Sequence, residues 1–359
     1  MKEKKRDILL DVMKGVGILL VVFAHTHKGI ANSVVYLFHM PLFLMLSGAA
    51  LVYASRFSLK KKFKGLIMPY FTFSIVSFIY WAFVEARFRP LHDDPIFTGW
   101  LGTLDIKIQQ FVNIFTAIGV DNAFNYNVVL WFLPCLFVAS LIYEGSKRIG
   151  GKSEAKAWIW KAVVSIVCIA VFAIIDCYDI RLLWCGELAL LSVPFLLIGE
   201  VGYPRLRAVM ERSKTLTILN GGGCLALFIL IYIWLEPKTD MNAHHLPALW
   251  IFYLMAVLGS VVVMAVCRFI EYRDHGWMQY CGKNSLIIMC VHEPIKRILI
   301  QVMAMATGIE TTALRQNLFL SVLIVILVAF ICIPIIHVIN NYLPFMIGKK
   351  RTFKLRIKN

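Results

Sequence analysis

The sequence predicts an all-α, polytopic integral membrane protein: a bundle of about ten transmembrane helices with both termini in the cytoplasm. Of its 359 residues, 60% are hydrophobic and only 16% are charged, whereas a soluble domain carries about 25% charged residues. The mean hydropathy is +0.74. Apolar runs of the length that a helix needs to cross a bilayer recur along the chain. These observations exclude an ordinary soluble domain.

We predict ten spans from the apolar runs, within a single membrane domain over residues 1–359. The spans are 8–27, 34–54, 66–86, 126–146, 158–176, 181–200, 216–235, 247–267, 284–306 and 317–346. Charged residues and a proline interrupt the ninth span, and Pro334 and Pro344 predict a kink or an early end in the tenth. We expect one long outer loop over 87–125, with an amphipathic stretch IKIQQFVNIFTAI, and a basic tail over 347–359.

The basic residues predict the orientation. Of the 37 Lys and Arg residues, 27 fall in the termini and the loops of one side, 7 in the opposite loops and 3 within spans. Such a bias marks the cytoplasmic side. We therefore attribute the net charge of +16 to topology and to anionic membrane lipids, because no basic-aromatic motif suggests nucleic acid. The expected location is the cytoplasmic membrane of a bacterium.

The first span carries three ionisable residues on one face. Lys14 and His25 lie eleven residues apart, which returns to nearly the same face about 16 Å further along a helix. Asp11 shares this face but is too far along it to touch His25, so we expect it to pair with Lys14. Ionisable residues at bilayer depth are costly and usually mark a functional site. A neutral imidazole can also take a proton from a hydroxyl group.

Polar residues in other spans are further candidates. His39 should lie at a depth similar to that of His25, but no third ligand follows, so we expect no metal. Ser47 favours close helix packing, and Trp131 is typical of an interfacial aromatic residue. Glu187 should pair with a cation or line a water-filled cavity. His292 precedes Pro294, and a broken helix at this depth usually lines a cavity.

Four stretches of the chain carry a family resemblance. They are Lys14 to His25 within RDILLDVMKGVGILLVVFAH, FHMPLFLMLSG at 38–48, KKKFKGLIMPY at 60–70, and WFLPCLF at 131–137 with GKNSLIIMCVHEP at 282–294. In order and spacing they resemble the membrane-bound acyltransferase-3 family, in particular its fucose 4-O-acetylase-like branch of surface polysaccharide O-acetyltransferases. The resemblance covers nearly the whole chain.

The resemblance implies transfer of an acetyl group from acetyl-CoA to a hydroxyl of a carbohydrate, either a surface glycan or a lipid-linked sugar. It implies His25 as the essential catalytic residue, which we group with Asp11 and Lys14. Lys14 matches a basic position of the family, and a basic pair of the family falls within Lys61, Lys62 and Lys64; all four are candidates to bind the donor. The candidates to bind the acceptor or the carbonyl oxygen are His39, Ser47, Trp131, Glu187, Asn284, Ser285 and His292.

Several alternatives stay open at this point. His25 is expected to act as general base on the acceptor hydroxyl, but a covalent acetyl-histidine relay fits the same residues. A transporter or flippase of a glycolipid or an acyl donor also needs buried polar residues along one helix face. Such a carrier is expected to show internal symmetry, and the sequence shows no strong internal repeat. A membrane sensor domain is a third class. The sequence does not determine the acceptor sugar, the choice between an acetyl and a succinyl group, or the oligomeric state.

Overall fold

The computed structural model describes residues 7–53, 57–87, 96–97, 99–120, 123–151, 153–271 and 276–349. The described part is helical and contains no β-strand, which confirms the predicted fold class. The longer helices are α1 (Ile8–Thr26), α3 (His39–Leu51), α5 (Met68–Phe83), α6 (Ile106–Thr116), α7 (Phe132–Ile149), α8 (Glu154–Cys177), α9 (Gly186–Arg212), α10 (Lys214–Leu235), α11 (Leu249–Glu271), α13 (Ser285–Thr307) and α15 (Leu318–Asn341).

Short helical segments connect these helices. They are α2 (Ile30–Tyr36), α4 (Leu59–Lys62), η1 (Phe63–Ile67), η2 (Glu85–Arg87), η3 (Gly99–Thr103), η4 (Val128–Trp131), η5 (Leu183–Cys185), α12 (Gly276–Lys283), α14 (Thr311–Gln316) and η6 (Pro344–Ile347). The amphipathic stretch of the outer loop forms α6. The tenth predicted span is shorter than expected, because α15 ends at Asn341 and Pro344 begins η6.

Nine of the ten predicted spans coincide with helical stretches that are long and apolar enough to cross a membrane. These stretches are Ile8–Thr26, Ile30–Leu51, Leu59–Phe83, Val128–Ile149, Glu154–Cys177, Leu183–Arg212, Lys214–Leu235, Leu249–Glu271 and Leu318–Asn341. The remaining predicted span, 284–306, forms α13, which has 23 residues. Glu293, Lys296 and Arg297 lower its hydropathy, so its apolar character alone does not identify it as a span.

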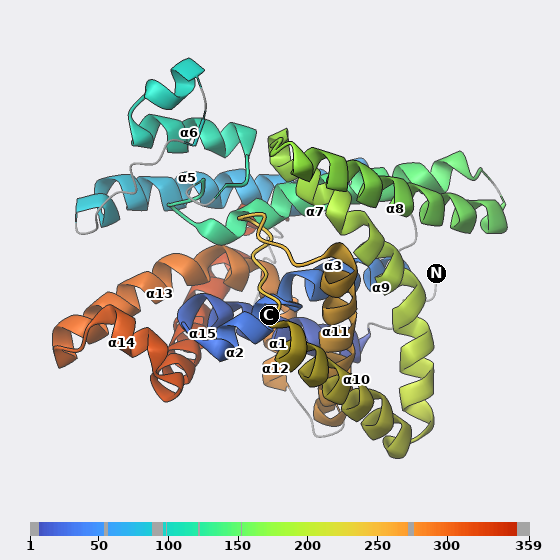
Figure 1. The fold of residues 1–359 in the computed structure, drawn as a ribbon. Helices are drawn as coiled ribbons and strands as arrows, with labels where there is room; N and C mark the ends of the chain where they lie inside the picture. Colours follow the sequence, from blue (N-terminus) through green and yellow to red (C-terminus); the bar gives the residue numbers. More distant parts are fainter. Residues whose placement is uncertain are drawn as a thin grey trace, which may run out of the picture.

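Helix α1 lies at the centre of the bundle and packs against α3, α11, α12, α13 and α15. In Figure 1, α5, α7 and α8 form a layer along the top of the view, over α1, α13 and α15. Helix α9 contacts α3, α7 and α8, and α10 packs along α11 at the edge of the molecule. The central position of α1 explains why its polar face is enclosed.

Both ends of the described chain lie on the same face of the bundle. Gly348 packs against the backbone of Lys64, and η6 contacts η1 and α5. At the start of α1, Asp7 accepts hydrogen bonds from Tyr53 and Tyr203. Lys62, two residues from Lys64, lines a pocket together with Lys14, which places these contacts at one end of α1. A chain that returns to its starting face crosses an even number of times, so the predicted count of ten requires α13 to cross as well.

Two glycines bring α3 and α9 into close contact. A Cβ atom on Gly48 would clash with the backbone of Leu196, and one on Gly199 would clash with the backbone of Met45. Small residues at such contacts let helix backbones approach closely. The contact places Ser47 and Glu200, the neighbours of the two glycines, beside the same pocket.

Candidate active site

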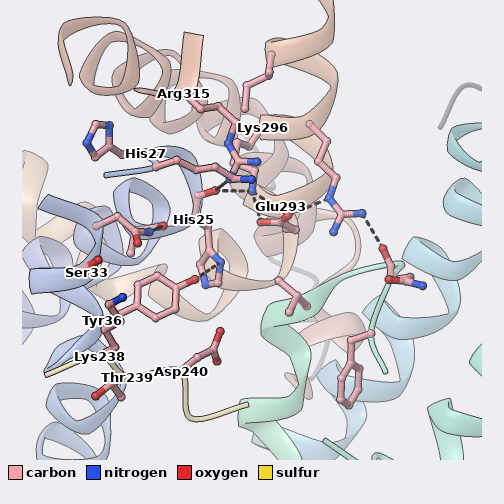
Figure 2. Close-up of a pocket in the computed structure, with 18 residues that line it drawn as sticks. His25, His27, Ser33, Tyr36, Lys238, Thr239, Asp240, Glu293, Lys296 and Arg315 are labelled. Carbon is pink, nitrogen blue, oxygen red and sulfur yellow. Dashed lines mark hydrogen bonds and ion pairs between the residues drawn. The ribbon is translucent and has the colours of Figure 1, made fainter. Parts of the chain in front are cut away.

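A polar cavity of about 600 Å³ lies at the end of α1 that carries His25. Residues from α1, α2, α13, α14, the segment before η4 and the connection between α10 and α11 line it (Figure 2). They are Ala24, His25, His27, Lys28, Asn32, Ser33, Tyr36, Phe124, Asn125, Val128, Lys238, Thr239, Asp240, Glu293, Lys296, Arg297, Ile300 and Arg315. A volume of this size is typical of a small-molecule site.

The last turn of α1 is held by donors from elsewhere in the chain. The final carbonyl groups of a helix have no partner within it and need hydrogen bonds from outside. Here Phe23 O accepts from the His27 N–H, Ala24 O from Asn32, His25 O from Lys296 (2.8 Å) and Arg315 (3.0 Å), and Thr26 O from Arg315 (2.9 Å). The position of His25 is therefore fixed by α2, α13 and α14 as well as by its own helix.

Three imidazole rings and a phenol meet at His25. The ring centroid of His25 lies 5.9 Å from that of His292, 6.2 Å from that of His39 and 5.8 Å from that of Tyr36. The Tyr36 hydroxyl lies 3.4 Å from His25 Nδ1. Figure 2 shows Tyr36 pointing at His25 from α2. Residues from four helices thus converge on one ring.

The hydrogen bonds of His39 and His292 define their tautomers. Nδ1 of His39 lies 3.0 Å from Val35 O, and Nδ1 of His292 lies 3.0 Å from Ile288 O. A carbonyl oxygen only accepts, so each Nδ1 carries the hydrogen and each Nε2 is an acceptor. Nε2 of His292 is buried and has no partner within the described residues. Such a group fits a ligand that donates a hydrogen bond.

A chain of ion pairs runs from α13 to η2 behind His25. The carboxylate of Glu293 accepts from Lys296 Nζ at 2.7 and 2.8 Å and from Arg297 Nε at 2.9 Å. Arg297 Nη1 also donates to Glu85 at 3.2 Å and to Asn125 O at 2.6 Å. Because buried charges are stable only when they are paired, this chain of contacts fixes the side chain of Lys296. Two hydrogens of its ammonium group bond to Glu293, and the third bonds to the backbone carbonyl oxygen of His25.

A proline shapes α13 next to the site. Pro294 lacks an N–H group, so Cys290 O, four residues earlier, has no donor within the helix. The side-chain amide of Asn127 donates to this carbonyl at 2.8 Å and to Ser77 Oγ at 3.1 Å. Asn127 thereby ties α13 to α5 and to the segment before α7. The carbonyl that Pro294 leaves without a helical donor is therefore satisfied from outside the helix, next to His292.

A second pocket, of about 380 Å³, lies at the opposite end of α1. Its lining includes five lysines from α1, α4, α7 and α8 and two carboxylates; they are Lys14, Lys61, Lys62, Lys147, Lys161, Glu144 and Glu200. Lys62 Nζ donates to Ser140 Oγ at 3.2 Å. On the far wall Lys161 pairs with Glu200 at 2.6 Å, and Tyr143 donates to the same carboxylate. The pocket is therefore basic overall, and on one side the charges of Lys161 and Glu200 neutralise each other.

The structure brings together some of the predicted site residues. The rings of His39 and His292 lie beside that of His25, which alone of the three lines the larger cavity, and Lys14, Ser47, Lys61 and Lys62 line the basic pocket. Lys14 and His25 project from the same helix, about 16 Å apart along its axis by residue count. Ser47 Oγ donates to Phe43 O at 2.8 Å.

Other predicted residues lie elsewhere. Lys64 faces Gly348, and Trp131 is buried in the core, edge-on to Phe132. Asp11 is buried where α1 packs against Gly282 of α12, and no contact between Asp11 and His25 occurs, as expected. These three residues line neither of the two cavities.

Two predicted polar residues serve local contacts. Glu187 is fully buried; its carboxylate lies 3.1 Å from His244 Nε2 and accepts a hydrogen bond from the N–H of Leu182 at 2.8 Å. Asn284 joins α12 to α15: it donates to Tyr280 O and accepts from Asn340 at 2.8 Å. Ser285 follows it at the start of α13, about 10 Å along the helix from His292.

The sequence prediction missed several cavity residues. Lys296, Arg297 and Glu293 gave a signal, because they place three charges within an apolar run, but they were read only as an interruption. Tyr36, Arg315 and Asp240 gave none. Tyr36 lies near the start of the second predicted span, and Arg315 and Asp240 flank spans, where polar residues are ordinary. Only the folded bundle brings the three to one cavity.

The fold and the site define a polytopic membrane protein with two polar pockets joined by one central helix. A family model described as an acyltransferase domain, that of the acyltransferase-3 family, matches residues 7–338. The chain therefore belongs to the acyltransferase-3 family and is a membrane acyltransferase. No curated protein and no solved structure gave a match to the chain.

Proposed function

We propose that the protein transfers an acetyl group from acetyl-CoA to a hydroxyl of a carbohydrate, with His25 as general base. One observation carries the proposal: α1 presents Lys14 to a basic pocket at one end and His25 to a polar cavity at the other. An enzyme that takes its donor from the cytosol and its acceptor from the outer side needs this arrangement. The bias of the basic loops supports a cytosolic basic pocket.

The basic pocket fits the phosphate groups of the donor. Lys14, Lys61, Lys62 and Lys147 approach from three helices, and ammonium groups are strong donors to phosphate oxygens. The pantetheine arm would pass along α1 and present the thioester near His25. Lys64 lies outside this pocket, so we assign donor binding to the other lysines.

The larger cavity fits a sugar. His25 and Tyr36 line it, while His39 and His292 lie beside the His25 ring, outside the cavity lining, with their Nδ1 atoms bonded to backbone carbonyls. His25 takes the proton of the reacting hydroxyl. The oxygen forms the new ester bond with the acetyl carbon, the bond from that carbon to sulfur breaks, and the proton passes to the departing thiolate. The products are an O-acetylated sugar and CoA.

The test offers labelled acetyl-CoA and a carbohydrate extract of the cells that make the protein to the protein purified in nanodiscs. The proposal predicts release of free CoA and stable label on a glycan, with both signals lost in His25→Ala. A carrier would instead move labelled donor or glycolipid across sealed vesicles without releasing CoA. That result, or equal transfer by His25→Ala, would overturn the proposal.

A further inference from the structure

Three cations from separate outer connections converge on the His25 cavity. Lys28 follows α1, Lys238 follows α10, and Arg315 lies on α14, yet all three line the same cavity. In the view of Figure 2, Arg315 lies above His25 and Lys238 lies below Tyr36. The sequence assigns only seven basic residues to the outer loops. Nearly half of them therefore gather at one place.

The inner cations of the cavity are engaged by the protein itself. Lys296 directs its hydrogen bonds to the two oxygens of Glu293 and to His25 O. Arg297 is shared between Glu293, Glu85 and Asn125 O. Two carboxylates thus balance two cations behind His25, so the positive charge of these residues is not available to a substrate.

The charge at the mouth of the cavity is not balanced in this way. Among the cavity-lining residues, Asp240 is the one carboxylate besides Glu293, and it accepts hydrogen bonds from the backbone N–H groups of Asn242 and Ala243. Lys28 and Lys238 are exposed, and no described carboxylate forms an ion pair with either ammonium. Two exposed ammonium groups, those of Lys28 and Lys238, therefore lie at the mouth without a carboxylate partner among the described residues, which favours a negatively charged ligand.

We infer that the acceptor is an acidic carbohydrate. Its carboxylate or phosphate group lies at the mouth, against Lys28 and Lys238, while one of its hydroxyls reaches His25. This inference rests on the proposed function and adds the charge class of its substrate. Charged hydrogen bonds of this kind also orient a flexible glycan, so that one hydroxyl meets the imidazole.

The first experiment determines whether the acceptor is negatively charged, and it does not require the acceptor to be identified. The protein in nanodiscs receives labelled acetyl-CoA and the glycan extract, and the labelled product is passed over an anion-exchange resin. We expect the label to be retained. Two treatments then identify the acidic group. Chemical reduction of carboxyl groups abolishes retention on the resin if the product carries a carboxylate, and phosphatase or mild acid abolishes it if the product carries a phosphate. Label on a neutral glycan overturns the inference and leaves the proposed function standing, whereas absence of any labelled glycan overturns both.

The second experiment uses the double variant Lys28→Gln/Lys238→Gln, with Lys107→Gln as the matched control. Lys107 is an exposed lysine of α6 in the outer loop and lies outside the cavity. We expect the KM for the acidic acceptor to rise about tenfold or more in the double variant, with the KM for acetyl-CoA unchanged. The control should match the wild type. An unchanged KM for the acceptor in the double variant would overturn the inference.

Discussion

The ammonium group of Lys296 on α13 donates a hydrogen bond of 2.8 Å to the backbone carbonyl oxygen of His25 at the end of α1. The two residues are 271 positions apart in the chain. Lys296 is itself fixed by Glu293, one helical turn earlier. The orientation of the His25 imidazole therefore depends on a charged network in a different helix.

Loss of this contact should slow catalysis. We expect Lys296→Met to lower kcat about 10²-fold, because a small displacement of a catalytic group has an effect of this order. Lys296→Arg should retain part of the activity, since a guanidinium group can also reach both partners. The measurement is acetyl transfer at saturating substrates. A folded Lys296→Met protein with the wild-type kcat would show that the contact does not position His25.

Substitution in the basic pocket should weaken donor binding. Lys14→Gln removes a cation that lines this pocket beside Lys61 and Lys62, so we expect a higher KM for acetyl-CoA with little change in the KM for the acceptor. Lys64→Gln is the control, because Lys64 lies against Gly348 outside the pocket. Initial rates at varied acetyl-CoA concentrations measure the effect. An equal rise for Lys14→Gln and Lys64→Gln would contradict the placement of the donor.

The proline of α13 should determine how much Asn127 contributes to stability. Asn127→Val leaves Cys290 O without a donor and should lower the free energy of unfolding by about 1–3 kcal/mol. In the Pro294→Ala background the restored N–H can satisfy this carbonyl, so the same substitution should cost less. Denaturation of the four proteins in detergent gives the double-mutant cycle. Equal costs in both backgrounds would show that Asn127 does not compensate for the N–H group that Pro294 lacks.

The start of α1 should make stability depend on pH. Burial alone would raise the pKa of Asp7, but hydrogen bonds from Tyr53, the Leu10 N–H and Tyr203, with the charge of Arg207, hold it below its ordinary value of 3.8. The charged carboxylate therefore stabilises the folded state above pH 3.8, and this contribution is lost as the pH falls through the lower, folded-state pKa.

Asp7→Asn should reveal this contribution. We expect the variant to have a lower Tm than the wild type at pH 7, and the difference between the two proteins to shrink below pH 3.8. Thermal denaturation at the two pH values measures it. A difference in Tm that stays constant with pH would show that the charge of Asp7 is not the stabilising feature.

Much of the fold and part of the site could be predicted from the sequence. The spans follow from apolar length, because a helix must satisfy its own backbone in lipid. His25 and His39 were placed at similar depth by a simple count of residues along two antiparallel spans, and their rings lie 6.2 Å apart. Pro294 predicts a broken helix after His292, but this prediction is wrong, because α13 continues through the proline as one helix.

The other site residues could not be predicted, for physical reasons. Glu187 is fully buried, as His292 is, but its contact with His244 could not be predicted. His244 lies in the connection between α10 and α11, and the sequence does not define the path of that connection. Asn284 forms hydrogen bonds at the junction of α12 and α15, which the sequence does not define. Lys28, Lys238 and Arg315 come together only through the packing of distant connections, and a single sequence carries no record of that packing.

The rate of acetyl transfer by His25→Ala tests the central claim most directly, with His337→Ala as the control because His337 is an exposed histidine of α15. Loss of a general base usually lowers the rate by about 10² to 10⁴. We predict a loss of this size for His25→Ala, with normal folding and normal binding of acetyl-CoA, and the wild-type rate for the control. Transfer by folded His25→Ala at the wild-type rate would contradict the account.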